Sequence, residues 1–358
     1  MTEPFGVGII GAGTIAKVHA EAIGSLVEAC VVAVADPREE AGRALAASHG
    51  ADWHARSEAL LARPDVDLAV LATPSGLHPD QAVLAARAGK HVITEKPMAI
   101  TAEGIDRMIG ACREARVTLS VIFQNRFTPD AVRLKRAVDA GLLGQPVLGG
   151  AVVHWRRTPA YYEGSGGWRG TWALDGGGAL MNQAIHTVDL LQWLLGPVAD
   201  VSAETATLAH RIEAEDTAAA VLRFASGALG VIQGTTTASK DWPVRVEVIG
   251  TAGRAVLEGG RLAVWEAERP ADDTLLTPRD RELTAGAWPD EPFGAAHRRQ
   301  LRAIFASLRA GEIPPLPGAE ARKAVDIILA IYRSAASGER VAVSPSPLVP
   351  SEGARARA

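Results

Sequence analysis

Cysteine is scarce in this 358-residue chain, which contains only Cys30 and Cys112. Each lies within an apolar run, so we expect two free, buried thiols and a reducing compartment rather than a disulfide framework. Positive charge is not in excess either, because 37 Lys and Arg stand against 41 Asp and Glu, a net charge of −4. Such a balance offers nothing to neutralise a phosphate backbone, and we expect no nucleic-acid partner.

Long hydrophobic runs are also missing. Leu190–Leu195 and Val66–Thr73 are apolar but far shorter than the roughly 18 residues that span a bilayer. The first residues, MTEPFGVGIIGAG, lack the basic start of a signal peptide. We therefore expect no membrane partner and a cytoplasmic location. The 47% hydrophobic and 22% charged residues exclude a disordered chain, a collagen-like repeat and a coiled coil.

The length predicts two domains, at roughly 100–200 residues for each. In the first 125 residues, short apolar runs alternate with amphipathic segments, the pattern of a parallel sheet between two helical layers. The predicted strands are Phe5–Ile10, Cys30–Ala35, Leu68–Ala72, His91–Thr94 and Val117–Phe123. We expect residues 1–125 to form an α/β Rossmann domain, with a doubly wound parallel sheet that binds a dinucleotide.

The pattern changes after Arg126. We predict a helix at Pro129–Ala140, a strand at Val147–Trp155, an irregular glycine- and tryptophan-rich segment at 156–178, and an apolar helix at Ala179–Leu195. Further strands are predicted at Ala218–Phe224, Ala228–Thr235, Val244–Ile249 and Arg254–Glu258, and closing helices at Phe293–Arg309 and Ala319–Ser337. Residues 126–343 should thus form an α+β domain with a large open, mainly antiparallel sheet for substrate binding and oligomerisation. Residues 344–358 are expected to be a disordered tail.

A glycine-rich turn follows the first predicted strand. Gly11-Ala12-Gly13-Thr14-Ile15-Ala16 has the form G-x-G-x-x-A and opens a predicted helix. Gly11 allows a tight turn, Gly13 lets the backbone approach a pyrophosphate, and Ala16 lets helix and strand pack closely. The free amides and the helix dipole then face the phosphates. We expect Gly11, Ala12, Gly13, Thr14 and Ile15 to bind the cofactor.

Asp36 ends the second predicted strand, where a carboxylate can accept hydrogen bonds from both hydroxyls of an adenosine ribose. Its charge would repel a 2′-phosphate, which favours NAD over NADP. Arg38, two positions later, leaves NADP open, because a guanidinium stacks on adenine or pairs with a 2′-phosphate. The other interpretation of Arg38 is a solvated residue in the first turn of a helix.

Four further motifs follow in order: Thr73-Pro74-Ser75-Gly76-Leu77-His78, Glu95-Lys96-Pro97, Gln124-Asn125-Arg126-Phe127, and Gly176-Gly177-Gly178 leading to Asn182 and His186. Over about residues 4–250 the chain resembles the Gfo/Idh/MocA family, named after glucose–fructose oxidoreductase, inositol dehydrogenase and rhizopine catabolism. The resemblance implies a nicotinamide held between a Rossmann domain and an open-sheet domain. It also implies sugar or cyclitol substrates and a cis peptide bond before Pro97.

Two of these motifs, Thr73–His78 and Glu95-Lys96-Pro97, follow strands at the carboxyl edge of the parallel sheet, where ligands bind. Thr73, Pro74 and His78 are expected beside the cofactor, although His78 is equally explained as a capping or packing residue. Lys96 should project into the crevice, where its ammonium group stabilises negative charge on the reacting oxygen. Glu95 either holds this lysine or binds the cofactor ribose.

Asn182, His186 and Asp189 are spaced by four and three residues on an apolar helix, which would place them on one face. His186 matches the family's histidine and suits proton abstraction from an alcohol. At position 182 the family often has Asp. Asn182 takes no proton, so it can only orient the substrate or His186. Asp189 is expected to support the fold or the histidine.

Aromatic and basic residues accompany these groups. Trp155 precedes the segment at 156–178, which contains Tyr161, Tyr162, Trp168, Arg169 and Trp172. Aromatic rings stack on the C–H faces of sugars, and a guanidinium binds hydroxyls or a carboxylate. Packing of Trp168 beneath this segment is an equal alternative. Following the resemblance, we also expect Asn125 and Arg126 to contact the substrate. The nine histidines are scattered, and we expect no metal site.

The motifs together predict an NAD(P)-dependent dehydrogenase that moves a hydride between nicotinamide and a secondary hydroxyl of a sugar, cyclitol or glycoside. Lys96 and His186 would be its catalytic residues. One alternative is an NAD-retaining glycosidase that oxidises C3 only transiently. Others are a non-catalytic cofactor-sensing regulator and an enzyme that reduces C=N bonds. The bare face of an open sheet predicts a homodimer or homotetramer.

Overall fold

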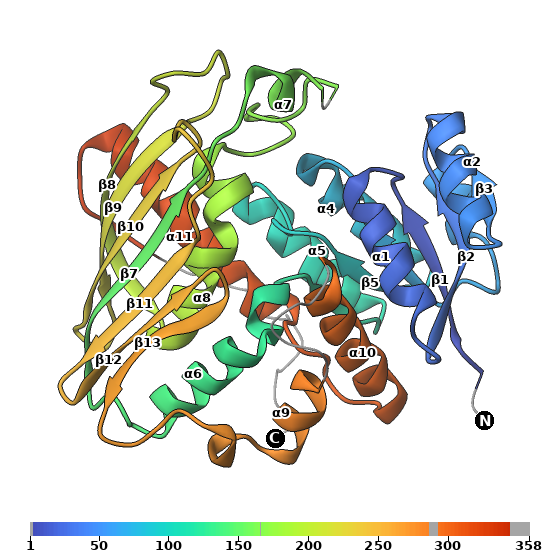
Figure 1. Cartoon of the computed structure of the whole chain (residues 1–358). Coiled ribbons are helices and arrows are strands. Elements are labelled where there is room, and N and C mark those ends of the chain that lie inside the picture. Colours follow the sequence, from blue (N-terminus) through green and yellow to red (C-terminus); the bar gives the residue numbers. More distant parts are fainter. Residues whose placement is uncertain (1–2, 165, 286–292, 344–358) are drawn as a thin grey trace, which may run out of the picture.

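The computed structural model describes residues 3–164, 166–285 and 293–343, so the predicted tail lies outside the described residues. Two β-sheets stand apart with helices between them (Figure 1). The first sheet belongs to the N-terminal part of the chain and the second to the rest. This arrangement confirms the predicted α/β Rossmann domain followed by an α+β domain.

The six-stranded first sheet has the order β3-β2-β1-β4-β5-β6, and all its strand pairs are parallel. Its strands are β1 Phe5–Ile10, β2 Ala29–Ala35, β3 Asp52–His54, β4 Leu68–Leu71, β5 His91–Thr94 and β6 Leu119–Val121. Its helices are α1 Thr14–Gly24, α2 Glu39–Ser48, α3 Ser57–Leu61, α4 His78–Arg87 and α5 Ala102–Glu114, with a 3-10 turn η1 at Ser75–Leu77. The strand order reverses between β1 and β4, which opens a crevice at the carboxyl ends.

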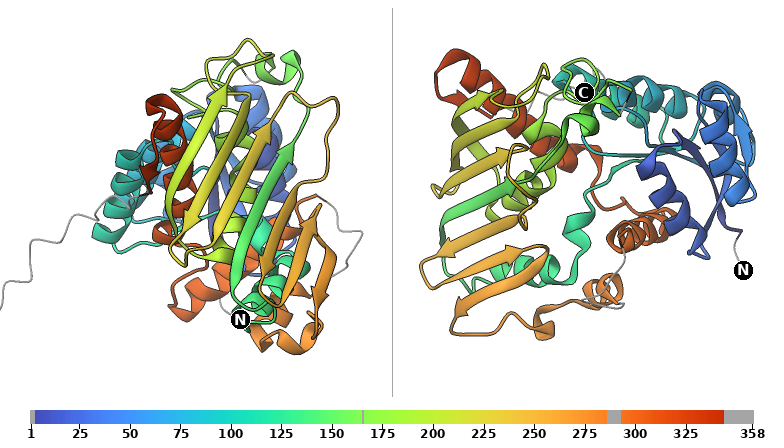
Figure 2. Two further views of the ribbon diagram at one scale, coloured as in Figure 1. Left: turned by 90° about the vertical axis from the view of Figure 1, so that its left-hand side faces the viewer. Right: turned by 45° about the horizontal axis from the view of Figure 1, so that its top comes forward.

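The eight-stranded second sheet has the order β13-β12-β11-β7-β10-β9-β8-β14, and only the β7–β10 pair is parallel. Its strands are β7 Pro146–His154, β8 Val198–Ala206, β9 Thr217–Phe224, β10 Leu229–Thr235, β11 Arg245–Gly250, β12 Gly253–Glu258, β13 Arg261–Ala267 and β14 Val341–Ala342. Helices α6 Pro129–Asp139, α8 Ile185–Leu195 and α11 Gly318–Ser337 cover the face toward the first sheet. No helix covers the other face among the described residues (Figure 2).

The 156–178 segment and the helix after it differ from prediction. Pro159–Glu163 forms a short helix, α7, with proline at its first position, whereas we expected no regular structure there. The apolar helix starts as a π-helical segment, η3, at Ala179–Ala184 before α8 begins. π-Helical turns are rare and occur often at functional sites. The three-and-four spacing of an α-helix therefore does not hold at Asn182.

Several elements were missed because their patterns are weak. Strand β3 is only three residues long, and β8 and β13 carry several polar residues. Helix α9, Pro278–Thr284, is set by a capping box between Thr277 and Asp280. The remaining 3-10 turns are η2 at Gln124–Phe127 and η4 at Asp273–Leu275. Both cysteines are free, but Cys30 is exposed, contrary to prediction.

Helix α10, Ala295–Ala310, returns to the first sheet and packs against α1. Its Leu301, Ile304 and Phe305 share a buried cluster with Val7 and Ile9 of β1. In the part of the chain described, no helix is both long and apolar enough to cross a membrane. The C-terminal segment thus ties the two sheets together around the crevice.

Candidate active site

The glycine-rich turn leaves space for a dinucleotide. Gly11 has φ 105°, and a Cβ there would lie 2.5 Å from the Ala72 carbonyl oxygen, so only glycine fits. A Cβ on Gly13 would meet nothing within 4 Å, which leaves its surroundings open. No side chain caps the first turn of α1, so its amides are available to an anion. These features fit the pyrophosphate of a dinucleotide.

Asp36 is buried at the end of β2 beside this turn. Its Oδ2 accepts a hydrogen bond from the Ala12 amide at 2.7 Å, and both its oxygens accept from the largely exposed Arg38 guanidinium at 2.9–3.0 Å. Burial alone would raise the pKa of Asp36, but the hydrogen bonds from Arg38 and Ala12 outweigh it and lower the pKa. The carboxylate is therefore charged at the point where an adenosine ribose would lie.

His78 joins two loops at the carboxyl edge of the sheet. The imidazole is fully buried, with Nδ1 2.9 Å from the Pro97 carbonyl oxygen and Nε2 3.0 Å from that of Thr73. The Lys96–Pro97 peptide bond is cis, as the resemblance implied. With both ring nitrogens facing backbone, His78 supports the loops that carry Thr73 and Lys96, and the packing interpretation explains it.

Glu95 lies in a buried cluster with two histidines that the sequence motifs did not single out. Its Oε1 is 2.8 Å from His19 Nε2 on α1 and 4.0 Å from His297 Nε2 on α10, and its Oε2 accepts from the Lys96 amide. Burial opposes ionisation of Glu95, but His19, His297 and Lys96 lower its pKa to about 2. Burial lowers the pKa of His297 to about 4. Glu95 is thus an anion that fixes the backbone at Lys96.

Lys96 and His186 meet at the junction of the two domains. The Lys96 ammonium donates to the Asn182 carbonyl oxygen at 2.8 Å, one turn before His186, and both side chains stay partly exposed. Burial lowers the pKa of Lys96, and the Arg169 and Arg157 charges lower it further, against Glu95 and Asp175. Burial and the Lys96 charge hold the pKa of His186 well below its usual value. His186 is therefore a neutral base at pH 7.

Asn182 is held by its neighbours on three sides. Its amide nitrogen donates to Asp175, and its Oδ1 accepts from Gln183 Nε2 at 2.7 Å. Burial raises the pKa of Asp175 to about 6. The backbone oxygen of Asn182 thus accepts a hydrogen bond from Lys96, while Asp175 and Gln183 fix the Asn182 side chain.

A second buried carboxylate holds the start of the π-helical segment. Glu215 accepts from the Gly178 amide at 3.0 Å, the Leu180 amide at 2.8 Å and the Tyr332 hydroxyl at 2.9 Å. Burial raises the pKa of Glu215 to about 7, against these hydrogen bonds. A Cβ at Gly178 would lie 1.9 Å from the Glu215 carbonyl oxygen. The glycine run is thus required for this close packing under His186.

Arg126 does not face the crevice. Its buried guanidinium makes a two-pronged ion pair with Asp189, at 2.6 and 2.7 Å, and a third contact of 3.1 Å with Glu320. The pair joins η2 to α8, which accounts for Asp189 as a supporting residue and argues against a substrate contact for Arg126. A guanidinium so engaged cannot turn toward a ligand without leaving a buried charge unpaired.

Asn125 and Trp155 line a cavity of about 420 Å³ beside these groups, and Thr187, the residue after His186, lines the same cavity. His297 and Trp242 also contribute to its wall. Its size falls in the range of small-molecule sites, roughly 300–1,000 Å³. A ligand in this cavity would contact Asn125 and Trp155.

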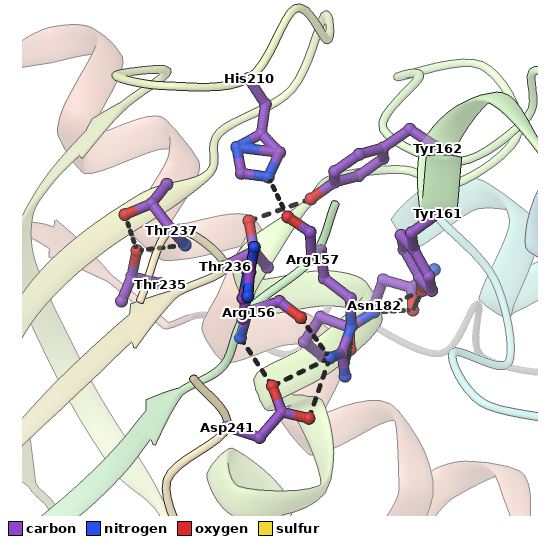
Figure 3. Close-up of polar contacts among 11 residues, drawn as sticks. Arg156, Arg157, Tyr161, Tyr162, Asn182, His210, Thr235, Thr236, Thr237 and Asp241 are labelled. Carbon is purple, nitrogen blue, oxygen red and sulfur yellow. Dashed lines mark hydrogen bonds and ion pairs between the residues drawn. The ribbon is translucent and has the colours of Figure 1, made fainter. Parts of the chain in front are cut away.

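Two of the three arginines in the 156–178 segment stack on aromatic rings. Arg169 stacks on Tyr161 at 4.1 Å and lies 5.4 Å from the Trp168 ring, and Arg157 lies over Trp155 at 4.7 Å. Figure 3 shows Arg157 between Asp241 and the Tyr161–Asn182 pair. Trp168 therefore packs against Arg169 in this structure. Within the described ranges, no group of three or more His, Cys, Asp or Glu is arranged to hold a metal.

Asp175, Glu215, His19 and His297 were missed by sequence reasoning because no local motif marks them. His19, His297 and Glu215 act on partners distant in the sequence, for example 76 positions from His19 to Glu95, whereas Asp175 lies seven residues before Asn182. Two weak signals existed: Asp175 directly precedes the three glycines, and His19 lies on the helix of the glycine-rich turn.

Two family models match the chain in succession. Residues 5–123 match the oxidoreductase family with an NAD-binding Rossmann fold, and residues 131–256 match the GFO/IDH/MocA C-terminal domain. Among curated proteins, the uncharacterized oxidoreductase YrbE of Bacillus subtilis is 31% identical over 73% of this chain and 76% of its own length. Myo-inositol 2-dehydrogenase of Thermotoga maritima is 28% identical over 89% of this chain and 92% of its own.

A solved structure extends the similarity over nearly the whole chain. The WlbA dehydrogenase from Bordetella pertussis, in complex with NADH and UDP-GlcNAcA, has 38% sequence identity and a TM-score of 0.87. The match covers 96% of this chain and 98% of that one. Together with the crevice geometry, these matches establish that the chain belongs to the Gfo/Idh/MocA family of oxidoreductases with an NAD-binding Rossmann fold.

Proposed function

We propose that this protein oxidises a secondary hydroxyl group of a sugar, with His186 as the base and Lys96 as the group that holds the reacting oxygen. The observation that supports this proposal most strongly is that the Lys96 ammonium contacts the backbone of Asn182, close to His186, at the junction of the two domains. Both Lys96 and His186 keep some solvent exposure at this junction.

The cofactor belongs on the first sheet. When bound, NAD supplies the acceptor for the hydride. The chain's own part is to hold the pyrophosphate at Gly11–Gly13 and the ribose at Asp36, with Ala12, Thr14 and Ile15 completing the turn and Thr73 and Pro74 alongside. The charged Asp36 favours NAD, and NADP remains the alternative through Arg38.

His186 and Lys96 divide the handling of charge. A neutral imidazole takes the hydroxyl proton, and its depressed pKa keeps it available at neutral pH. The ammonium of Lys96 stabilises the negative charge that develops on the same oxygen. The anionic Glu95 and its bond to the Lys96 amide fix the lysine's backbone while this happens.

For the substrate, we propose a nucleotide-linked sugar acid as the class to test before free sugars and cyclitols. Support comes from the UDP-GlcNAcA held by the WlbA dehydrogenase. It also comes from the positive charges of Arg157 and Arg169, which lie near enough to Lys96 to lower its pKa. The cavity lined by Asn125 and Trp155 offers room for a group attached to the sugar.

A substrate panel tests this proposal. The purified protein is assayed at 340 nm with NAD or NADP and, in turn, UDP-GlcNAcA, UDP-GlcNAc, free glucuronate and myo-inositol. We expect the highest kcat/KM with UDP-GlcNAcA and NAD. Turnover of myo-inositol alone would overturn the nucleotide-linked class, and no NADH with any sugar would overturn the dehydrogenase itself.

The assembly we propose is a homodimer or a dimer of dimers formed through the bare face of the second sheet. Supporting it, β9 alternates buried and exposed residues, and Val221 on that strand and Leu229 on β10 are about half exposed. Light scattering at micromolar concentration should give a multiple of 37.5 kDa. A mass of one chain would overturn the assembly. A cytoplasmic location likewise stays a prediction.

A further inference from the structure

Tyr161, one of the aromatic residues expected to stack on a sugar, also presents its hydroxyl group beside Asn182. It is a partly buried residue of α7, and Figure 3 shows its ring directed toward Asn182. Asn182 also carries the Lys96 ammonium on its backbone oxygen, at 2.8 Å. Tyr161 and Lys96 therefore flank the same residue from the two domains.

The Tyr161 hydroxyl is oriented by one strong hydrogen bond. It accepts from Gln183 Nε2 at 2.7 Å, and Gln183 is itself fixed by the Arg157 guanidinium, which donates to Gln183 Oε1 at 2.8 and 3.1 Å. Its own proton is directed toward Asn182 Oδ1 at 3.5 Å, well beyond the usual O–H···O range. A phenol with its acceptor side engaged and its donor side only weakly engaged is ready to donate to a ligand.

The ring of Tyr161 is also fixed in place. The Arg169 guanidinium stacks on it at 4.1 Å, the Arg157 guanidinium lies 5.2 Å away, and the edge of Tyr162 meets it at 5.1 Å. Burial raises the pKa of Tyr161, so the hydroxyl keeps its proton at neutral pH. A hydroxyl held in one direction loses little freedom when it binds, which is how specific contacts are built.

We infer that Tyr161 is a specificity-determining residue that donates a hydrogen bond to a hydroxyl oxygen of the bound sugar, next to the oxygen held by Lys96. This rests on the proposed function, because it assumes a sugar in the crevice. Gln183 acts as a positioning residue, since it turns the phenol without touching the substrate.

Two neighbouring tyrosines make a matched experiment. Tyr161→Phe keeps the ring between the guanidinium groups and removes only the hydroxyl. Tyr162→Phe is the control, because the Tyr162 hydroxyl donates to Thr236 Oγ1 at 2.9 Å, outside the proposed contact. Both variants are assayed with NAD and UDP-GlcNAcA, and NADH affinity is measured by fluorescence to verify that the cofactor site is intact.

We expect kcat/KM to fall on the order of 10- to 100-fold in Tyr161→Phe, because one hydrogen bond to the substrate is lost, and by less than about twofold in Tyr162→Phe. NADH affinity should be unchanged in both. A set of UDP-GlcNAcA analogues, each lacking a different sugar hydroxyl, provides a second measurement. The ratio of kcat/KM for UDP-GlcNAcA to that for each analogue reports on specificity, and misfolding would not change this ratio. Wild type should discriminate strongly against one analogue, and Tyr161→Phe should discriminate against it far less.

A second variant covers the case in which Tyr161→Phe is unstable. Gln183→Leu keeps the phenol but releases it, and we expect the same loss of discrimination with a smaller loss of kcat/KM. Equal kinetics for the Tyr161→Phe and Tyr162→Phe variants, with discrimination intact, would overturn the role of Tyr161 and leave the dehydrogenase standing. A wild type that oxidises none of the sugars would overturn the proposed function and this inference with it.

Discussion

The two sides of the crevice are built in different ways. The cofactor side uses backbone: the glycine-rich turn after β1, with Gly11 at φ 105°, and the free amides of α1 lie within a few residues of one another. The substrate side uses side chains from distant segments, with 86 residues between Lys96 and Asn182 and 85 between Arg156 and Asp241. Short motifs predict most of the first kind of site, whereas the second also depends on pairings between segments that no motif specifies.

This difference separates cofactor binding, which proteins of this fold can share, from the choice of substrate, in which they can differ. Backbone amides recognise the pyrophosphate common to dinucleotides, and their positions change only if the path of the backbone changes. Side chains such as Arg157, Tyr161 and Gln183 can be exchanged one at a time without moving a strand. We therefore expect substitutions on the substrate side to alter catalysis and choice of sugar while cofactor binding persists.

Lys96 gives the largest test of this separation. Lys96→Met keeps the aliphatic stem but removes the charge that stabilises the reacting oxygen, so kcat should fall on the order of 10²–10³-fold. NADH affinity, measured by fluorescence titration, should change little. Near wild-type turnover would contradict the role of Lys96, and a loss of NADH binding would break the separation of the two sides.

The same variant has a pH signature. The Lys96 charge lowers the pKa of His186, after burial as the larger cause. Removing this charge should raise the pKa of His186 and move the acid limb of kcat/KM to higher pH, because the base must be neutral to take a proton. Profiles of wild type and Lys96→Met between pH 5 and 9 measure the shift. An acid limb that stays in place or moves down would show that another group is the base.

Asp36 gives a smaller effect on the cofactor side. Asp36→Ser removes the carboxylate that now engages Arg38 at 2.9 Å and frees the guanidinium for a 2′-phosphate. The ratio of kcat/KM for NAD to that for NADP should fall on the order of 10- to 100-fold, with sugar preference unchanged. If wild type already prefers NADP in steady-state assays, Arg38 dominates and the interpretation of Asp36 is wrong.

Glu215 affects stability more than turnover. Its pKa is raised to about 7, so the folded state favours the protonated form, and this contribution is lost as pH rises through 7. Relative to Glu215→Gln, which does not titrate, wild type should lose roughly 1–3 kcal/mol of unfolding free energy between pH 5 and 8. Urea unfolding of both proteins at the two pH values gives this difference. A difference independent of pH would place the pKa of Glu215 near its ordinary value.

Much of the fold could be predicted because its signals are local. The strands of the first sheet are nearly continuous apolar runs, and β1 and β5 have the predicted bounds. β3 has no such run, and α7 lies in a segment whose glycines and tryptophans suggested irregular structure. Local signals also fail where packing decides, as at η3, where Glu215 and the glycine run hold a π-helical turn.

The site divides along the same line. Gly11, Asp36, Lys96 and His186 were predicted from motifs with a fixed place in the chain. Arg126 also belongs to a motif, but it forms an ion pair with Asp189, 63 residues later in the chain. The spacing of residues in the sequence does not reveal this pairing. Asp175 was missed although it lies only seven residues before Asn182, because the glycine run and the π-helical segment there follow no regular period. Regular local geometry can be derived from sequence, whereas irregular turns and partner choice among distant side chains cannot.

The central claim is net hydride transfer from a sugar to NAD, and product stoichiometry tests it most directly. The protein is incubated with NAD and UDP-GlcNAcA, and NADH, keto-sugar nucleotide and free UDP are quantified at several times. The account predicts NADH and keto product in equal amounts and no released UDP. Release of UDP without accumulating NADH would contradict it and identify a glycosidase that oxidises its substrate only transiently.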